Sequence, residues 1–189
     1  MKSVITKDIE EVFAQLEKTQ HEFWNIAPET GNFLNMLIKM TKKKHMLEIG
    51  TSNGYSAMWF ALALREIGGT LDTIEFWDKR RQLALENFKK IGVSDLITAH
   101  LGGAIELLPE LCREKTFDFV FIDANKAEYI EYFDIINPFL EKGAIIACDN
   151  VLSHELKVQP FVDKIKADEN YQTEILNLPA GLLLALKIN

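Results

Sequence analysis

The sequence offers little that would direct the chain to a membrane, to secretion or to nucleic acid. No apolar run approaches the roughly 20 residues of a membrane-spanning helix. The opening MKSVITKDIEEVF lacks the apolar core of a signal peptide. The formal net charge is −7, and the basic run at positions 42–44 is short. Neither nucleic acid nor an anionic membrane is therefore an expected partner.

Cysteines are scarce as well, and Cys112 and Cys148 are not spaced as metal ligands. This excludes a disulfide scaffold and makes a reducing cytoplasm the expected location. The chain also lacks internal repeats, low-complexity tracts and linkers, so residues 1–189 are expected to form one domain. Helices within residues 1–44 are expected to cover a ligand crevice. The first of them could pack on its own domain or on a second subunit in a homodimer.

Strand and helix patterns alternate along the chain, which predicts a Rossmann-like three-layer α/β/α sandwich around a mostly parallel sheet. The predicted strands span residues 46–49, 71–75, 96–101, 117–122, 144–148, 171–178 and 182–188. The predicted helices span residues 6–24, 30–41, 55–67, 78–91, 105–112, 127–140 and 155–168. Between the first two helices, Trp24, Asn25 and Ile26 could line a site, although core packing is the expected role of Trp24.

One βαβ unit runs from Met46 to Glu75 and predicts a site for a ribose-bearing ligand. Gly50 and Gly54 interrupt the chain after the first strand, where the lack of a Cβ would let the backbone approach the ligand. The helix that follows directs its unpaired N–H groups into the crevice. Glu75 ends the second strand, where its carboxylate can accept both ribose hydroxyls.

The glycine spacing and a second acid favour S-adenosylmethionine over NAD as the ligand. The turn reads Gly-x-x-x-Gly, and dinucleotide-binding proteins carry Gly-x-Gly-x-x-Gly. Glu48, inside the end of the first strand, would be poorly placed beside a pyrophosphate. An acid there suits a positively charged group such as a sulfonium.

Polar residues also follow two later apolar strands. Asp123 ends one of them, and Asp149 with Asn150 ends the next. Because parallel strands present their carboxyl ends at one edge of the sheet, these side chains should reach the same crevice. The oxygen ligands suit Mg²⁺ above all, or Mn²⁺ or Ca²⁺, rather than Zn²⁺. The alternative is that both acids cap the helices that follow them.

Lys126 comes three residues after Asp123 and can lean over the same crevice. A partly desolvated lysine beside a divalent cation loses its proton more readily, which makes Lys126 a candidate general base. A solvated lysine at the start of a helix is the alternative interpretation.

Several motifs together resemble a known family. They are LEIGTSNGYS at 47–56, TIE ending at Glu75, GGAIELLPEL at 102–111, FDFVFIDANKAEY at 117–129 and GAIIACDNVL at 143–152. From about Gly31 to its C-terminus, the chain resembles the cation-dependent small-molecule O-methyltransferases. This group contains the catechol and caffeoyl-CoA O-methyltransferases and their bacterial relatives.

The resemblance implies a seven-stranded sheet of order 3-2-1-4-5-7-6 with strand 7 antiparallel. It also implies transfer of a methyl group from S-adenosylmethionine to a hydroxyl of a small phenolic or catechol-like acceptor. The implied cofactor-binding residues are Glu48, Gly50, Thr51, Ser52, Gly54, Ser56, Glu75, Phe76, Gly103, Ala104, Asp123 and Asn125. The implied metal ligands are Asp123, Asp149 and Asn150, and the implied catalytic residues are Lys126 and Asp123.

The chain departs from the family pattern at Gly103, at Asn125 and after DNVL, where SHELKVQPF replaces a longer substrate loop. Three other functions stay open at this point. One is a methyltransferase that uses no metal, and a second is a nicotinamide-dependent oxidoreductase. The third is a cofactor-binding module that acts through a partner surface.

Overall fold

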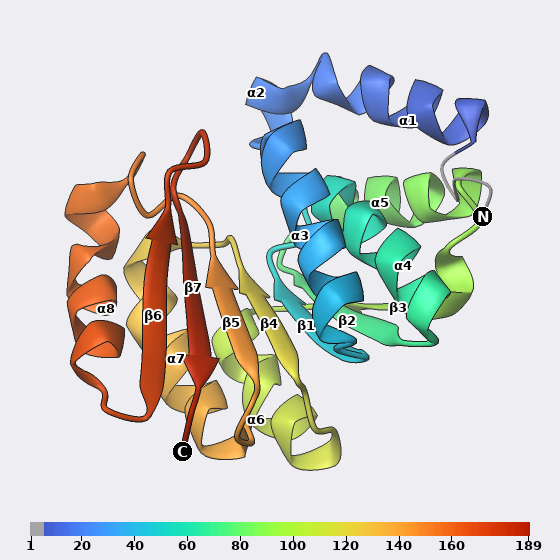
Figure 1. Ribbon diagram of the computed structural model, residues 1–189. Helices are drawn as coiled ribbons and strands as arrows, with labels where there is room; N and C mark the ends of the chain where they lie inside the picture. The colour runs from blue at the N-terminus through green and yellow to red at the C-terminus, as the bar shows by residue number, and fades with distance from the viewer. Residues whose placement is uncertain (1–5) are drawn as a thin grey trace.

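The computed structural model describes residues 6–189 as one seven-stranded sheet with helices on both of its faces (Figure 1). The strands are β1 (His45–Ile49), β2 (Thr70–Glu75), β3 (Ile97–Leu101), β4 (Phe119–Ile122), β5 (Ile145–Cys148), β6 (Tyr171–Leu176) and β7 (Leu182–Lys187). Their order is β3-β2-β1-β4-β5-β7-β6. Strand β7 runs antiparallel to both of its neighbours, and the remaining pairs are parallel. The predicted fold, sheet order and orientation are confirmed.

The helices are α1 (Lys7–Glu17), α2 (Gln20–Phe23), α3 (Pro28–Thr41), α4 (Tyr55–Ile67), α5 (Asp78–Lys90), α6 (Ala104–Glu114), α7 (Tyr129–Ile136) and α8 (Glu155–Ala167). Short 3₁₀ turns occur at η1 (Ser94–Leu96), η2 (Lys126–Glu128) and η3 (Asn137–Phe139). Across residues 6–189, none of the helices combines the length and the apolar character that crossing a bilayer requires.

The sheet separates two apolar cores, and β4 shows how one strand serves both. Phe119 and Phe121 point to one face, where the Phe121 ring meets Phe60 of α4 edge-on at 5.1 Å between centroids. Val120 and Ile122 point to the other face. A central parallel strand is apolar on both sides because helices cover both.

Three predicted helices differ from the structure by more than a shift of one or two residues at an end, or differ for a clear local reason. The helix predicted at 6–24 is two helices, because α1 ends at Glu17 and α2 begins at Gln20. Between them, the hydroxyl of Thr19 donates to the carbonyl of Leu16 at 3.1 Å. The second helix begins at Pro28 rather than at residue 30, since proline is tolerated in a first turn, where its missing N–H is not needed. The helix predicted at 127–140 is regular only within α7, and Pro138 lies in the 3₁₀ turn that ends it.

Strand register brings the predicted site residues to one edge of the sheet. Ile49 at the end of β1 pairs with Ile74 of β2 and with Ile122 of β4, and Ile122 pairs in turn with Cys148 of β5. The residues that follow these strands therefore emerge side by side at the carboxyl edge of the sheet.

Candidate functional site

A cavity of about 590 Å³ lies at the carboxyl edge of the sheet. This volume is typical of a small-molecule site. Eleven of the predicted site residues line it: Gly50, Thr51, Ser52, Ser56, Glu75, Phe76, Gly103, Ala104, Asp123, Asn125 and Lys126. The cavity thus extends from the end of β2, past the glycine turn after β1, to the end of β4.

Glu48 does not line the cavity but lies fully buried behind its wall. Its carboxyl accepts hydrogen bonds from the hydroxyls of Ser56 and Thr73, each at 2.5 Å. The Thr73 hydroxyl is also within 2.6 Å of that of Thr51. Burial raises the pKa of Glu48 to about 8. Glu48 therefore acts on the cavity through Ser56 and Thr51, which do line it.

Gly50 and Gly54 are required for a different reason from the one predicted. Both have positive φ, 103° and 85°. A Cβ at Gly50 would lie 2.2 Å from the carbonyl oxygen of Asp123, and one at Gly54 would lie 2.5 Å from the ring of Phe88. The space beside each glycine is filled by the protein itself rather than reserved for a ligand, and Gly54 does not line the cavity.

Backbone N–H groups fix the carboxylate of Glu75 in place. The amide of Ser52 donates to Oε2 at 2.7 Å, and the amide of Trp77 donates to Oε1 at 2.9 Å. A carboxylate offers about four lone-pair sites. Both oxygens therefore keep capacity to accept hydroxyl groups from a ligand in the cavity.

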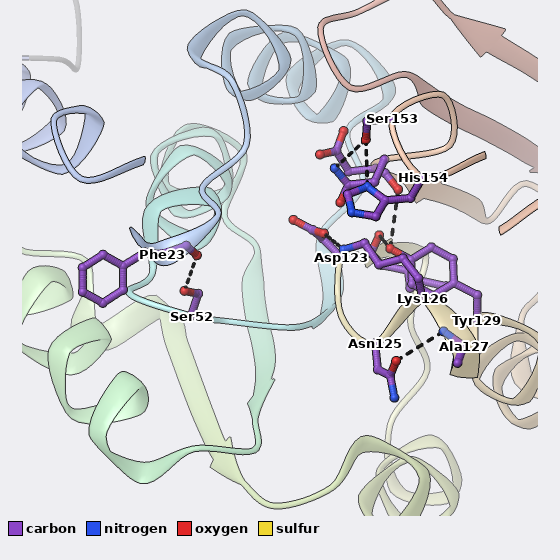
Figure 2. Close-up of polar contacts among 12 residues, drawn as sticks. Phe23, Ser52, Asp123, Asn125, Lys126, Ala127, Tyr129, Ser153 and His154 are labelled. Carbon is purple, nitrogen blue, oxygen red and sulfur yellow. Dashed lines mark hydrogen bonds and ion pairs between the residues drawn. The ribbon is translucent and has the colours of Figure 1, made fainter. Parts of the chain in front are cut away.

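Asp123 and Lys126 face one another at the other side of the cavity (Figure 2). The lysine Nζ lies 2.7 Å from Asp123 Oδ1, and both side chains are largely buried. The lysine of this pair is therefore held beside the cavity by a charge-assisted hydrogen bond.

Asp149 and Asn150 follow β5, and neither is among the residues that line this cavity. Asp149 is 2% exposed, and its Oδ1 has no hydrogen-bond partner within residues 6–189. Burial, followed by the charge of Asp123, raises the pKa of Asp149. Asn150 has a left-handed backbone with φ of 67°, and its amide nitrogen donates to the hydroxyl of Ser153 at 3.2 Å. An unsatisfied carboxylate oxygen beside a second acid is costly unless something positive binds there.

Sequence reasoning also placed Trp24 wrongly. Its side chain is 74% exposed and lines the cavity, where core packing had been predicted. Asn25 and Ile26 line the cavity, as proposed. Arg80, which also lines it, was not predicted because only the packing of α5 brings the first turn of that helix to the opening.

Comparison with known proteins identifies the family to which the chain belongs. The family model described as O-methyltransferase matches residues 2–188. The chain is 37% identical over 130 residues to a catechol O-methyltransferase of Niastella koreensis, which covers 68% of this chain and 58% of that protein. It is 34% identical over 165 residues to caffeoyl-CoA O-methyltransferase 1 of Zea mays, covering 84% of this chain and 64% of that protein. The chain thus spans less than two thirds of the length of either relative.

A solved structure agrees over nearly the whole chain. The O-methyltransferase TomG from Streptomyces achromogenes, involved in tomaymycin synthesis and solved in complex with SAM, superimposes with a TM-score of 0.86. The two sequences are 28% identical, and the match covers 95% of this chain and 90% of TomG. The chain belongs to the O-methyltransferase family.

Proposed function

We propose that this protein is an S-adenosylmethionine-dependent O-methyltransferase that methylates a hydroxyl of a small phenolic or catechol-like acceptor. One observation carries the proposal: a single cavity joins the fixed carboxylate of Glu75 to the Asp123–Lys126 pair. The first is suited to a ribose, and the second is suited to removing a proton from a hydroxyl. The names of the catechol and caffeoyl-CoA relatives and the SAM bound in TomG support the same reaction.

At the cofactor end, Glu75 would accept the ribose hydroxyls, while Phe76, Gly103 and Ala104 would border the adenine. Residues 50–56 and Asn125 would surround the rest of the cofactor. S-adenosylmethionine supplies an activated methyl group on a sulfonium, so no covalent intermediate with the protein is needed. The buried carboxyl of Glu48 would favour the positive sulfonium once it loses its own proton.

Asp123, Asp149 and Asn150 fit a hard divalent cation, with Mg²⁺ as our first choice. The described residues hold no group of three His, Cys, Asp or Glu side chains that could bind a metal, so any site here uses two carboxylates and an amide. The buried, unpaired Oδ1 of Asp149 supports a cation at this position. The oxygen-only set suits Mg²⁺, Mn²⁺ or Ca²⁺. A cation held there would orient the acceptor oxygens and make their hydroxyl protons easier to remove.

Lys126 would first give up its own ammonium proton to solvent and would then take the proton from the acceptor hydroxyl as the methyl group is transferred. Asp123 holds the lysine Nζ at 2.7 Å, so the base is already positioned before the acceptor binds. Orientation of the hydroxyl toward the methyl group would supply much of the acceleration.

The setting we propose is cytoplasmic, with the small-molecule acceptor as the principal partner and a homodimer as the assembly to be tested. Cys112 and Cys148 are both buried free thiols, which suits a reducing compartment. Light scattering on the purified protein would decide between monomer and dimer.

Ligand binding and turnover test the proposal directly. S-adenosylhomocysteine should raise the melting temperature of the protein, and NADH should not. With S-adenosylmethionine, Mg²⁺ and a catechol, mass spectrometry should find the acceptor heavier by one methyl group. Stabilisation by NADH alone would instead support an oxidoreductase.

Two further results would favour the remaining alternatives. Turnover that survives both EDTA and Asp149→Ala would establish a methyltransferase that uses no metal. Binding of S-adenosylhomocysteine without methylation of any member of a panel of phenols would favour a binding module.

A further inference from the structure

Trp24 and Arg80, which line the cavity, form an arrangement with Trp77 that the proposed reaction does not yet use. The guanidinium carbon of Arg80 lies 5.0 Å from the ring centroid of Trp24 and 5.6 Å from that of Trp77. Both indoles are exposed, by 74% and 57%. Arg80 takes part in none of the ion pairs found within residues 6–189. Its charge is therefore directed at two aromatic faces, in a cation–π arrangement.

The chain is strained where it meets this arrangement. Trp24 has a left-handed backbone, with φ of 55° and ψ of 40°, and Ser52 is also left-handed, with φ of 50°. Non-glycine residues hold this conformation only when their surroundings enforce it. The two strained positions are joined directly, because the hydroxyl of Ser52 donates to the carbonyl of Phe23 at 2.8 Å (Figure 2).

These contacts form a closed cycle that includes Glu75, the residue proposed to bind the ribose. Trp24 stacks on Arg80, and Arg80 stacks on Trp77. The amide of Trp77 donates to Glu75, which accepts in turn from the amide of Ser52. The hydroxyl of Ser52 then donates to the carbonyl of Phe23, in the peptide that precedes Trp24. A nucleoside bound at Glu75 would therefore contact one member of the same cycle of interactions that holds Trp24 in place.

Helix α2, which leads into Trp24, is held less firmly than the helix before it. Helix α1 is anchored in the core by Phe13, which is 5% exposed and meets the ring of Tyr55 edge-on at 5.4 Å. The Tyr55 hydroxyl also donates to Glu17 at the end of α1 at 2.8 Å. Helix α2, in contrast, buries none of its residues. Segments with few buried apolar contacts open most easily.

We propose that Trp24, Arg80 and Trp77 form a clasp that holds the corner after α2 closed over the adenosine end of the bound cofactor and slows its release. This inference rests on the proposed function, since the cofactor is the methyl donor of that reaction. Trp24 and Arg80 are positioning residues here. They stand on the Glu75 side of the cavity and leave the proton transfer at Lys126 untouched.

The test is the rate at which S-adenosylhomocysteine leaves the protein, measured by stopped-flow displacement. Arg80→Gln should release it about 5- to 30-fold faster, equivalent to about 1–2 kcal/mol at 1.4 kcal/mol per factor of ten. Trp24→Ala should do the same. Arg80→Lys and Trp24→Phe, which keep a cation and an aromatic face, should recover part of the loss.

Lys79→Gln is the matched control, because it removes one positive charge from the same helical turn at an exposed residue that does not line the cavity. It should release the ligand at the wild-type rate. Hydrogen exchange adds a second measurement: the ligand should protect amides of residues 20–26 in wild type and protect them less in Arg80→Gln.

The outcomes separate the clasp from the function on which it rests. If wild type binds S-adenosylhomocysteine and Arg80→Gln releases it at the same rate, the clasp is wrong and the proposed function stands. If Arg80→Gln raises only the KM for the acceptor, Arg80 contacts the acceptor and the clasp is again wrong. A wild-type protein that binds no S-adenosylhomocysteine overturns both proposals.

Discussion

The two ends of the cavity differ in how complete their polar contacts are. At the β2 end, both oxygens of Glu75 accept backbone N–H groups, and the buried carboxyl of Glu48 accepts two hydroxyls. At the β4–β5 end, Asp149 keeps a buried oxygen that finds no partner among residues 6–189, and Asn150 holds a left-handed backbone. At the first end, the protein itself supplies hydrogen-bond donors to both acids, although Asn25 nearby keeps an unpaired Oδ1 within residues 6–189. At the second end, a buried acid keeps an oxygen that an added positive group would satisfy.

This difference has a consequence for mutations at each end. Changes at the β4–β5 end should abolish turnover while leaving the fold and cofactor affinity nearly intact, because that end contributes little to either. Changes at the β2 end should weaken cofactor binding or alter stability, because its polar groups are already part of the folded network.

The largest effect is expected at Lys126. Lys126→Met should lower kcat about 10²- to 10⁴-fold, the range for loss of a general base, with little change in affinity for S-adenosylhomocysteine. Isothermal titration and initial rates measure the two quantities. Lys142→Met, at an exposed lysine outside the cavity, is the control and should behave as wild type. Equal loss of affinity and turnover would mean that the lysine acts by holding the site together.

Asp149→Ala comes next, with an expected fall in kcat of about 10²- to 10³-fold in the presence of Mg²⁺. The same variant should unfold at a temperature equal to or above that of the ligand-free wild type, because it removes a buried acid that has an unpaired oxygen. Differential scanning calorimetry checks the second point. Glu141→Ala, at an exposed acid, is the control. A markedly lower melting temperature would make Asp149 a structural residue.

Glu75→Ala should have a smaller and different effect. Loss of charge-assisted hydrogen bonds to the ribose should weaken S-adenosylhomocysteine binding about 10- to 100-fold, which corresponds to about 1.5–3 kcal/mol. Binding of Mg²⁺, followed by calorimetry, should not change. If cofactor affinity survives this substitution, the ribose is not held at the end of β2, and the proposed positions of cofactor and acceptor in the cavity are wrong.

Most of the fold could be predicted because its signals are local. Helix α4 spans the predicted residues 55–67, since apolar spacing and flanking glycines define both of its ends. The errors occurred where tertiary contacts decide. Nothing in the sequence of residues 6–24 marks the break after Glu17. Position 50 requires glycine because a Cβ there would clash with the carbonyl oxygen of Asp123, which lies far away in the sequence.

The site was predictable to the extent that strand ends define it. Glu75 and Asp123 follow apolar strands, so their meeting at one edge follows from parallel topology. Arg80 was missed, and Trp24 was assigned chiefly to the core, because their meeting depends on how α2 and α5 lie over the sheet. A tryptophan in a sequence predicts burial, and only the fold reveals that this one is 74% exposed.

The last prediction concerns pH and the buried carboxyl of Glu48. The pKa of Glu48 is about 8 in the fold against an ordinary 4.5, so between these values the folded state keeps a proton that the unfolded chain has lost. The free energy of unfolding of the ligand-free protein should therefore fall as pH rises from about 5 to 8, by up to about 1.4 kcal/mol per pH unit from this group. Asp149, whose pKa is also raised, contributes with the same sign. The informative quantity is thus the difference between wild type and Glu48→Gln. Gln cannot ionise and can still bond Ser56 and Thr73, so urea unfolding should find the variant less sensitive to pH. Parallel curves for the two proteins would show that Glu48 is already ionised in the fold, and the β2 end would then carry a buried charge of its own.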